Sequence, residues 1–334
     1  MTEPPLEASK VGASTVDAST VDASTGAASM GAAANYGGPV PDLNPALAQR
    51  LSAAGLDPGA VRSFVVAALA EDLAGGIDVT TAATVPRAEH GRADLVARTA
   101  GVVAGLPVAE AVFRLVSADV QCAPLAADGD RVAAGQALLT VSGPVGPILT
   151  AERTALNLLC HLSGVATLTS RWVDAVAGTG ARIRDTRKTL PGLRALEKYA
   201  VRCGGGVNHR MSLSDAALIK DNHVAAAGSV GAAFAAVRAQ APGLPLEVEC
   251  DTLDQVAEAL TAGADLILLD NFDVPELAAA VRLAGGRALL EASGGLTLTA
   301  ARAVAETGVD YLAVGALTHS APALDIGLDL VQAG

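Results

Sequence analysis

Six short apolar runs after residue 180 constrain the fold more than any other feature of the chain. Predicted helices separate them, among them 252–262, 274–284 and 298–307. Apolar strands that alternate with amphipathic helices indicate a parallel sheet covered by helices. Six units are fewer than the eight of a full α/β barrel, so we predict a closed or nearly closed α/β barrel that is shorter than a full eight-fold one. The runs are 181–183, 216–219, 246–248, 266–269, 288–290 and 311–314.

The sequence before the barrel predicts a smaller domain with both helices and strands. Residues 44–73 favour two helices, 92–142 are rich in short apolar runs between turn residues, and 151–176 favour one long helix. The turn-rich stretch 128–139 contains no lysine, which excludes a biotinyl or lipoyl carrier.

These patterns predict an α/β fold with three segments. A domain of helices and strands is expected at 41–152 and a barrel that carries the chemistry at 153–321, and a C-terminal helix at 322–334 is expected to pack back on the first domain. Residues 1–40 repeat the sequence Ala-Ser-Thr-Val-Asp and are dominated by small residues, so we expect a disordered low-complexity tail there.

Composition excludes several classes of function. A net charge of −12 and an aromatic content of 2% argue against binding to nucleic acid or to an anionic membrane. No apolar stretch approaches the length of a membrane span. Four widely spaced cysteines without a Cys-x-x-Cys pair indicate reduced thiols, and we expect a cytoplasmic protein.

Positive charge is concentrated between residues 182 and 220 in an otherwise acidic chain. This window holds three of the four lysines and six arginines, against three acidic residues. Arg194, Lys198 and Arg202 have helical spacing, so we interpret them as a solvated helix face. By contrast, Arg187, Lys188 and Lys220 follow predicted strands, where anion binding is the better explanation.

Polar residues follow every predicted barrel strand, at the edge where barrels bind ligands. Glu249 and Asp270 could neutralise structural charge, bind ribose hydroxyls or Mg²⁺, or stabilise a cationic transition state. Small residues before a predicted helix and after the last strand fit a phosphate cradle. The polar strand ends are 185–189, 220–223, Glu249, Asp270 with Asn271, 291–295, and Gly315 followed by His319.

One long motif resembles the signature of the quinolinate phosphoribosyltransferases, a decarboxylating nicotinate-nucleotide pyrophosphorylase family. It consists of Arg184-Asp185-Thr186-Arg187-Lys188-Thr189-Leu190-Pro191-Gly192-Leu193-Arg194, Glu197-Lys198-Tyr199-Ala200-Val201, Gly204-Gly205-Gly206, Asn208-His209-Arg210 and Leu218-Ile219-Lys220-Asp221-Asn222-His223. Further matching pieces lie at 152–157, 162–167, 247–249, 269–271 and 291–295, and the resemblance spans about 42–330.

The resemblance implies a function in de novo NAD biosynthesis. The phosphoribosyl group of phosphoribosyl pyrophosphate would pass to quinolinate with decarboxylation, giving nicotinate mononucleotide, pyrophosphate and CO₂. It implies an N-terminal α/β sandwich followed by an incomplete α/β barrel, and a homodimer in which each N-terminal domain closes the barrel of its neighbour.

The resemblance also implies residue roles. Lys188, Glu249 and Asp270 would be catalytic, with Lys188 between the substrates and the two acids on ribose hydroxyls. Mg²⁺ would be bound mainly through pyrophosphate, without a direct protein ligand. Quinolinate carboxylates would contact Arg153 of the partner subunit, Arg187, His209, Arg210 and Lys220, and the remaining substrate-binding residues would be Thr186, Ser293, Gly294, Gly295, Gly315 and His319.

Three alternatives remain at this point. A paralogue of the same fold could act on another base. A Schiff-base aldolase could use Lys220, which would require a desolvated lysine in place of a ring of arginines. A regulatory subunit could bind the same anions without turnover.

Overall fold

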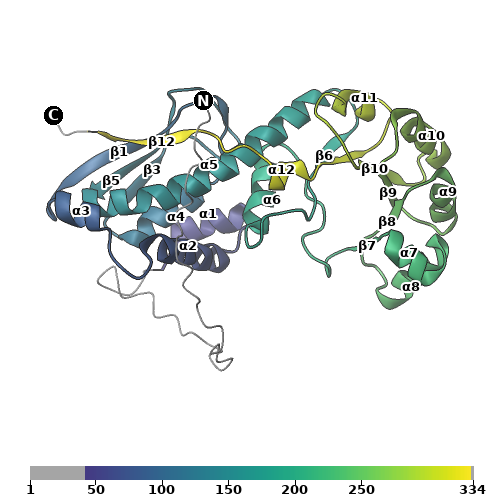
Figure 1. Cartoon of the computed structure of the whole chain (residues 1–334), viewed down its shortest axis with the longest axis horizontal. Helices are drawn as coiled ribbons and strands as arrows, with labels where there is room; N and C mark the ends of the chain where they lie inside the picture. Colours follow the sequence, from purple (N-terminus) through teal and green to yellow (C-terminus); the bar gives the residue numbers. More distant parts are fainter. Residues whose placement is uncertain (1–41, 332–334) are drawn as a thin grey trace, which may run out of the picture.

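The computed structural model describes residues 42–331, which form two lobes joined by one long helix (Figure 1). This helix, α5 (Val145–Ala175), begins six residues earlier than predicted. The expected domain boundary at 152/153 therefore lies inside a continuous helix. The tail expected at 1–40 lies outside the described residues.

The N-terminal lobe is built on an antiparallel sheet with the strand order β12-β1-β5-β3. Helices α4 and α5 lie in contact with each other, and α5 also contacts β1, β5 and β12. The strands are β1 (His90–Ala97), β3 (Gln121–Pro124), β5 (Ala137–Pro144) and β12 (Ile326–Val331), with β2 (Gly101–Val102) and β4 (Arg131–Val132) forming a separate pair. The helices are α1 (Pro45–Ala53), α2 (Pro58–Leu73), α3 (Val79–Thr84) and α4 (Leu106–Val116).

Helix α4 interrupts the region that was predicted to be β-rich. Its first turn is capped from a distance, because the carboxylate of Asp128 accepts hydrogen bonds from the backbone N–H groups of Gly105 (2.8 Å) and Leu106 (3.0 Å). By contrast, α1 and α2 begin with a local signal, an Asn44 or Asp57 cap followed by proline. A cap more than twenty residues away gives no local sequence signal.

The prediction of a C-terminal helix at 322–334 was wrong. Residues Ile326–Val331 form strand β12, which pairs antiparallel with β1 and places Leu328 opposite Leu95. Alternation of Ile326, Leu328 and Leu330 fits a strand, and the edge of β1 offers unpaired backbone groups to it. The segment does return to the N-terminal lobe (Figure 1).

The return path passes directly over α5. A Cβ at Gly164 would collide with the backbone of Pro322 and Ala323, so only glycine allows this close crossing.

The C-terminal lobe is a parallel sheet with the strand order β6-β11-β10-β9-β8-β7. Strands β6 and β7 form the two edges. On the side away from β11, β6 makes only an isolated bridge with Val207 among the described residues, so the barrel-like sheet is open between β6 and β7. The strands are β6 (Arg182–Arg184), β7 (Ala217–Ile219), β8 (Leu246–Cys250), β9 (Leu266–Asp270), β10 (Leu289–Ser293) and β11 (Tyr311–Ala313). These six strands confirm the predicted incomplete α/β barrel.

Helices lie along the outside of this sheet (Figure 1). They are α6 (Arg194–Cys203), α7 (Asp221–Ala227), α8 (Val230–Gln240), α9 (Leu253–Thr261), α10 (Val274–Ala284), α11 (Ala301–Ala305) and α12 (Ala316–His319). Between 42 and 331, no single helix is long and apolar enough to cross a membrane; α1 and α2 pass that test only as a pair, and they are bent by 109°.

Candidate active site

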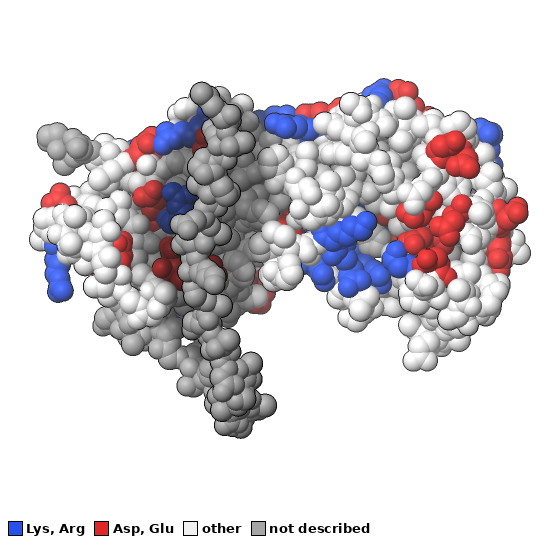
Figure 2. Space-filling view, viewed as in Figure 1, with Lys and Arg blue, Asp and Glu red and all other residues white. Residues whose placement is uncertain are grey.

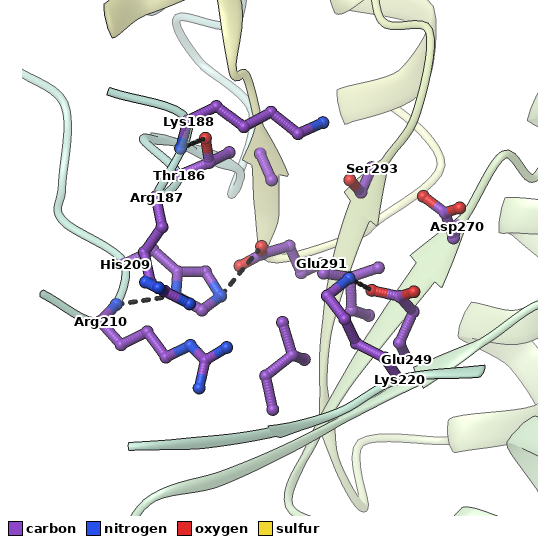
Figure 3. Close-up of a pocket in the computed structure, with 13 residues that line it drawn as sticks. Thr186, Arg187, Lys188, His209, Arg210, Lys220, Glu249, Asp270, Glu291 and Ser293 are labelled. Atoms are coloured by element: carbon purple, nitrogen blue, oxygen red, sulfur yellow. Dashed lines mark hydrogen bonds and ion pairs between the residues drawn. The ribbon is translucent and has the colours of Figure 1, made fainter. Parts of the chain in front are cut away.

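A cavity of about 370 Å³ opens at the carboxyl ends of the barrel strands (Figure 3). This volume lies within the range of small-molecule sites. The cavity brings together predicted residues from five different strand ends. Its lining consists of Thr186, Arg187, Lys188, His209, Arg210, Leu218, Lys220, Glu249, Leu268, Asp270, Glu291, Ser293 and Ala313.

Three cations of the cavity lack an acidic partner. Among the described residues, no carboxylate lies within 4.0 Å of the charged groups of Arg187, Lys188 or Arg210. The Nε of Arg187 is buried and has no hydrogen-bond partner in this part of the chain. Burial and the nearby Arg187 lower the pKa of Arg210. Crowded, desolvated cations of this kind are stabilised by a bound anion.

The opposite wall of the cavity carries the acids. Lys220 and Glu249 form an ion pair across the ends of β7 and β8. Asp270, at the end of β9, lies level with Ser293 of β10 and accepts a hydrogen bond from Asn271 Nδ2 (2.8 Å). Figure 2 shows basic side chains near the middle of the visible face, with acidic side chains directly beside them. The site therefore pairs an anion-binding wall with a wall that accepts hydrogen bonds.

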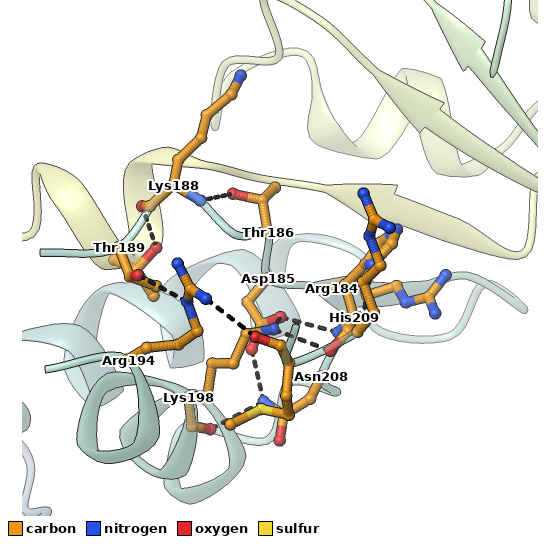
Figure 4. A network of polar contacts seen from close by, with 12 residues as sticks. Arg184, Asp185, Thr186, Lys188, Thr189, Arg194, Lys198, Asn208 and His209 are labelled. Carbon is orange, nitrogen blue, oxygen red and sulfur yellow. Dashed lines mark hydrogen bonds and ion pairs between the residues drawn. The ribbon is translucent and has the colours of Figure 1, made fainter. Parts of the chain in front are cut away.

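The interpretation of Lys198 as part of a solvated helix face was wrong. Its side chain is fully buried, pairs with Asp185, and donates to the backbone carbonyl of His209 (2.8 Å). Asp185 also accepts hydrogen bonds from Asn208 Nδ2 (2.5 Å) and the His209 N–H (2.8 Å). This network fixes the segment that carries His209 and Arg210 against β6 (Figure 4).

Arg194 and Arg202 also bind the protein instead of facing only solvent. Arg194 donates to Thr189 Oγ1 and to the Met211 carbonyl, both at 3.1 Å. Arg202 donates to Asn208 Oδ1 and to the Ala54 carbonyl, both at 2.7 Å. Helical spacing predicted the helix correctly but gave no information about tertiary partners.

A buried acid pair next to the cavity was missed. Glu247 and Glu291 are 3% and 0% exposed, and Arg184 pairs with Glu291. His209 Nε2 lies 2.7 Å from Glu247 and 3.7 Å from Glu291. Burial raises the pKa of each carboxyl to about 7 and lowers the pKa of His209 to about 4. A charged residue within a buried apolar strand was the available signal.

Both ring nitrogens of His209 are already engaged. Nε2 lies against Glu247, and Nδ1 accepts a hydrogen bond from the Arg210 backbone N–H (2.7 Å). The Nδ1 contact requires an unprotonated nitrogen, so the ring is the neutral tautomer with its proton on Nε2. His209 therefore presents no charge to a ligand in this arrangement.

Of the predicted phosphate residues, Ser293 lines the cavity, whereas Gly294, Gly295, Gly315 and His319 are not among its lining residues. A Cβ at Gly315 would lie 3.0 Å from Lys188 Cδ and 3.4 Å from His319 Nε2, so these three residues are neighbours. Gly294 and Gly295 follow Ser293 with φ of +86° and +58°. The helix expected at 298–307 is only Ala301–Ala305, so these glycines do not directly precede a helix.

Comparison with known proteins decides the family. The model of the quinolinate phosphoribosyl transferase N-terminal domain matches residues 78–163, and that of the C-terminal domain matches residues 165–329. The chain belongs to the quinolinate phosphoribosyltransferase family. The predicted resemblance is thereby confirmed.

Individual members of the family are similar over most of the chain. The nicotinate-nucleotide pyrophosphorylase [carboxylating] of Mycobacterium leprae is 57% identical over 276 residues, which cover 81% of this chain and 97% of the relative. A mitochondrial quinolinate phosphoribosyltransferase [decarboxylating] of Nicotiana glauca is 41% identical, with 79% and 80% covered.

Solved structures of family members have the same fold. NadC from Streptococcus pyogenes aligns with a TM-score of 0.79 at 42% identity, covering 83% of this chain and 99% of that one. The nicotinate-nucleotide pyrophosphorylase of Francisella tularensis aligns with a TM-score of 0.79 at 38% identity, covering 82% and 96%.

Arg153 is the one expected quinolinate contact of this family member that lies away from the cavity. It is exposed on α5, on the same helix as the exposed Asn157, and is not among the residues that line the pocket. A single chain therefore does not assemble the complete predicted set.

Proposed function

We propose that this cavity transfers the phosphoribosyl group of phosphoribosyl pyrophosphate to quinolinate, with decarboxylation. The products are nicotinate mononucleotide, pyrophosphate and CO₂. The observation that supports this best is the set of three cations without acidic partners, since both substrates are polyanions that repel each other in water. Relatives at 57% and 41% identity bear names for the same reaction.

In this proposal, different residues of the cavity bind different parts of the two substrates. Arg187, Arg210 and Lys220 bind quinolinate carboxylates. His209 orients Arg210, because its Nδ1 accepts a hydrogen bond from the backbone N–H of Arg210. Lys188 lies between the two substrates. Glu249 and Asp270 accept hydrogen bonds from ribose hydroxyls, and the phosphate groups bind near Thr186, Ser293, Gly294, Gly295, Gly315 and His319.

The chemistry needs positioning more than a nucleophile from the protein. The ring nitrogen attacks C1′ as pyrophosphate departs, and no covalent enzyme intermediate is involved. The resulting pyridinium accepts the electron pair of the C2–carboxylate bond, so CO₂ leaves. Arg187, Arg210 and Lys188 hold the reacting anions close together and screen their charges.

Magnesium fits this site as part of an anionic pyrophosphate complex. Lys188 lies beside the predicted phosphate residues Gly315 and His319, and Glu249 is already paired with Lys220. Among the described residues, His209, Glu247 and Glu291 form the one cluster with the geometry of a cation site. In this cluster Glu291 is already ion-paired with Arg184. We therefore propose that Mg²⁺ binds through pyrophosphate and neutralises its charge, without a direct protein ligand.

We further propose a cytoplasmic homodimer in which Arg153 of the partner subunit completes the quinolinate site. The exposure of Arg153 away from its own cavity supports this arrangement. The four free cysteines fit a reducing compartment.

The aldolase alternative is not favoured. Lys220 would have to be a desolvated amine, but its side chain is 45% exposed and is ion-paired with Glu249.

Replacing Lys188 or Arg210 with Ala tests the assignment. Each lost charge-assisted contact is expected to lower kcat/KM by at least about tenfold, in line with about 1.5–3 kcal/mol. Arg182→Ala is the matched control, because Arg182 is exposed on β6, the strand that precedes Lys188, and does not line the cavity. Near-normal turnover by both pocket variants would contradict the assignment.

A further inference from the structure

The acid pair Glu247–Glu291 has no task in the binding roles described above. Glu291 forms part of the cavity wall, whereas Glu247 lies behind it. Oε1 of each carboxyl is buried and has no hydrogen-bond partner among the described residues. Figure 3 shows the Glu291 carboxyl extending from β10 toward His209, within the cavity. An unpartnered buried carboxyl oxygen at a substrate cavity calls for a chemical explanation.

Charge balance indicates that the pair holds one proton. Arg184 is the fixed cation that pairs with both carboxyls. It lies 3.9 Å from Glu247 and in direct contact with Glu291. His209 is neutral, so the ionised pair with Arg184 would leave an excess negative charge in a nearly dry site. One proton on the pair makes the cluster neutral, and burial strongly favours a neutral cluster. The raised pKa of both carboxyls agrees with this.

Of the other described charged groups around the pair, only Arg210 has no acidic partner, and in the proposed complex a quinolinate carboxylate neutralises it. Arg210, Lys220 and Glu249 act on Glu247 from the cavity side, where Lys220 and Glu249 neutralise each other. Lys198 lies behind His209, but its charge is matched by Asp185. Tyr311 stacks on Arg184 at 4.9 Å and contributes no charge.

The proposed reaction needs a proton at one carbon atom. When CO₂ leaves C2 of the pyridinium ring, the electron pair of the broken bond remains on C2. A C–H bond must form there before the product leaves. Arginine does not donate protons at neutral pH, the ammonium group of Lys220 is paired with Glu249, and Lys188 lies beside the phosphate residues Gly315 and His319.

We propose that Glu291 delivers this proton to C2 and that the like charge of the neighbouring Glu247 keeps the proton on Glu291 until it is needed. The inference rests on the proposed function. The O–H bond of the acid breaks, the C2–H bond forms, and Glu291 becomes a carboxylate paired with Arg184. Solvent returns one proton to the pair after the product leaves. Glu291 is the catalytic residue, and Glu247 is a positioning residue.

Single-turnover experiments with Glu291→Gln test the proposal. Glutamine keeps the shape and the contact with Arg184 but cannot protonate carbon. Formation of nicotinate mononucleotide should slow by about a hundredfold, a typical effect of losing a general acid, whereas pyrophosphate release and quinolinate affinity should change by less than about threefold. The residual slow reaction of this variant should still show a solvent deuterium isotope effect, at least as large as that of the wild type, because C2 must then take its proton from solvent.

Glu110→Gln is the matched control. Glu110 is also buried and paired with arginines, Arg50 and Arg114, but it lies on α4 in the other lobe. Its rates should equal those of the wild type. Equal rates of nicotinate mononucleotide formation in Glu291→Gln and the wild type would overturn the proposal.

Glu247→Gln provides a second test that does not depend on the folding of the first variant. Without the like charge of Glu247, Glu291 next to Arg184 should lose its proton at lower pH. The alkaline limb of the pH profile for product formation should therefore shift by about one pH unit or more to lower pH. A profile that superimposes on that of the wild type would overturn the proposal. Absence of any nicotinate mononucleotide from the wild type would instead contradict the proposed function.

Discussion

Replacing Lys198 with Met is the sharpest test of how the site is held in place. The substitution removes a fully buried ammonium group and leaves Asp185, also 0% exposed, without its ion pair. Asp185 keeps the donors Asn208 Nδ2 and the His209 N–H, but the carbonyl of His209 loses Lys198. Breaking a buried pair from one side costs about 3–5 kcal/mol. We expect the free energy of unfolding to fall by this amount in guanidinium titrations.

The same variant should also bind quinolinate more weakly, since Lys198 fixes the segment that carries Arg210. Arg302→Met is a suitable control, because Arg302 and its partner Glu306 are both more than half exposed. Exposed ion pairs of this kind contribute only about 0.2–1 kcal/mol to the free energy of unfolding. Adding Asp185→Leu to Lys198→Met should recover part of the lost stability, because the unpaired buried charge is then gone. A loss below about 1 kcal/mol in Lys198→Met would refute the reasoning.

Further predictions concern the dimer, the metal and pH. Mixing subunits that carry Arg153→Ala with subunits that carry Lys188→Ala should restore about a quarter of wild-type turnover, because half of the dimers are mixed and each has one intact site; no recovery would contradict a shared site. Removing Mg²⁺ with a chelator should abolish turnover without shifting the thermal unfolding midpoint of the substrate-free protein by more than about 1 °C. Burial raises the pKa of Glu247 from 4.5 in the unfolded chain to about 7 in the folded protein. The free energy of unfolding of the wild type therefore falls as pH rises from about 4.5 to 7. In denaturant titrations, the stability of Glu247→Gln relative to the wild type should therefore increase by on the order of 1 kcal/mol between pH 5 and 8. A stability difference between the two proteins that does not change with pH would contradict a proton held by the acid pair.

The sequence predicted the barrel well because its signals are local. Each strand is an apolar run that ends in a polar residue, and parallel strands bring those ends to one edge. Arg187, Lys188 and Lys220 were placed in one site for this reason, and Arg210 was added through the family resemblance. The structure brings all four together.

The predictions that were wrong depended on partners distant in sequence. Lys198 matches an exposed helix position until Asp185, thirteen residues earlier, is known to face it. Helix α4 depends on Asp128 for its cap, and strand β12 depends on the free edge of β1, more than two hundred residues away. The pairing of Glu247 with Glu291 likewise requires strands β8 and β10 to be placed in the same sheet, on either side of β9.

The most direct test of the central claim is a product assay on the wild-type protein. Quinolinate, phosphoribosyl pyrophosphate and Mg²⁺ should give nicotinate mononucleotide, pyrophosphate and CO₂ in equal amounts. Nicotinate and other bases without the second carboxylate should react far more slowly, because they leave cations of the cavity unpaired. Pyrophosphate release without nicotinate mononucleotide, or faster turnover of another base, would contradict the account.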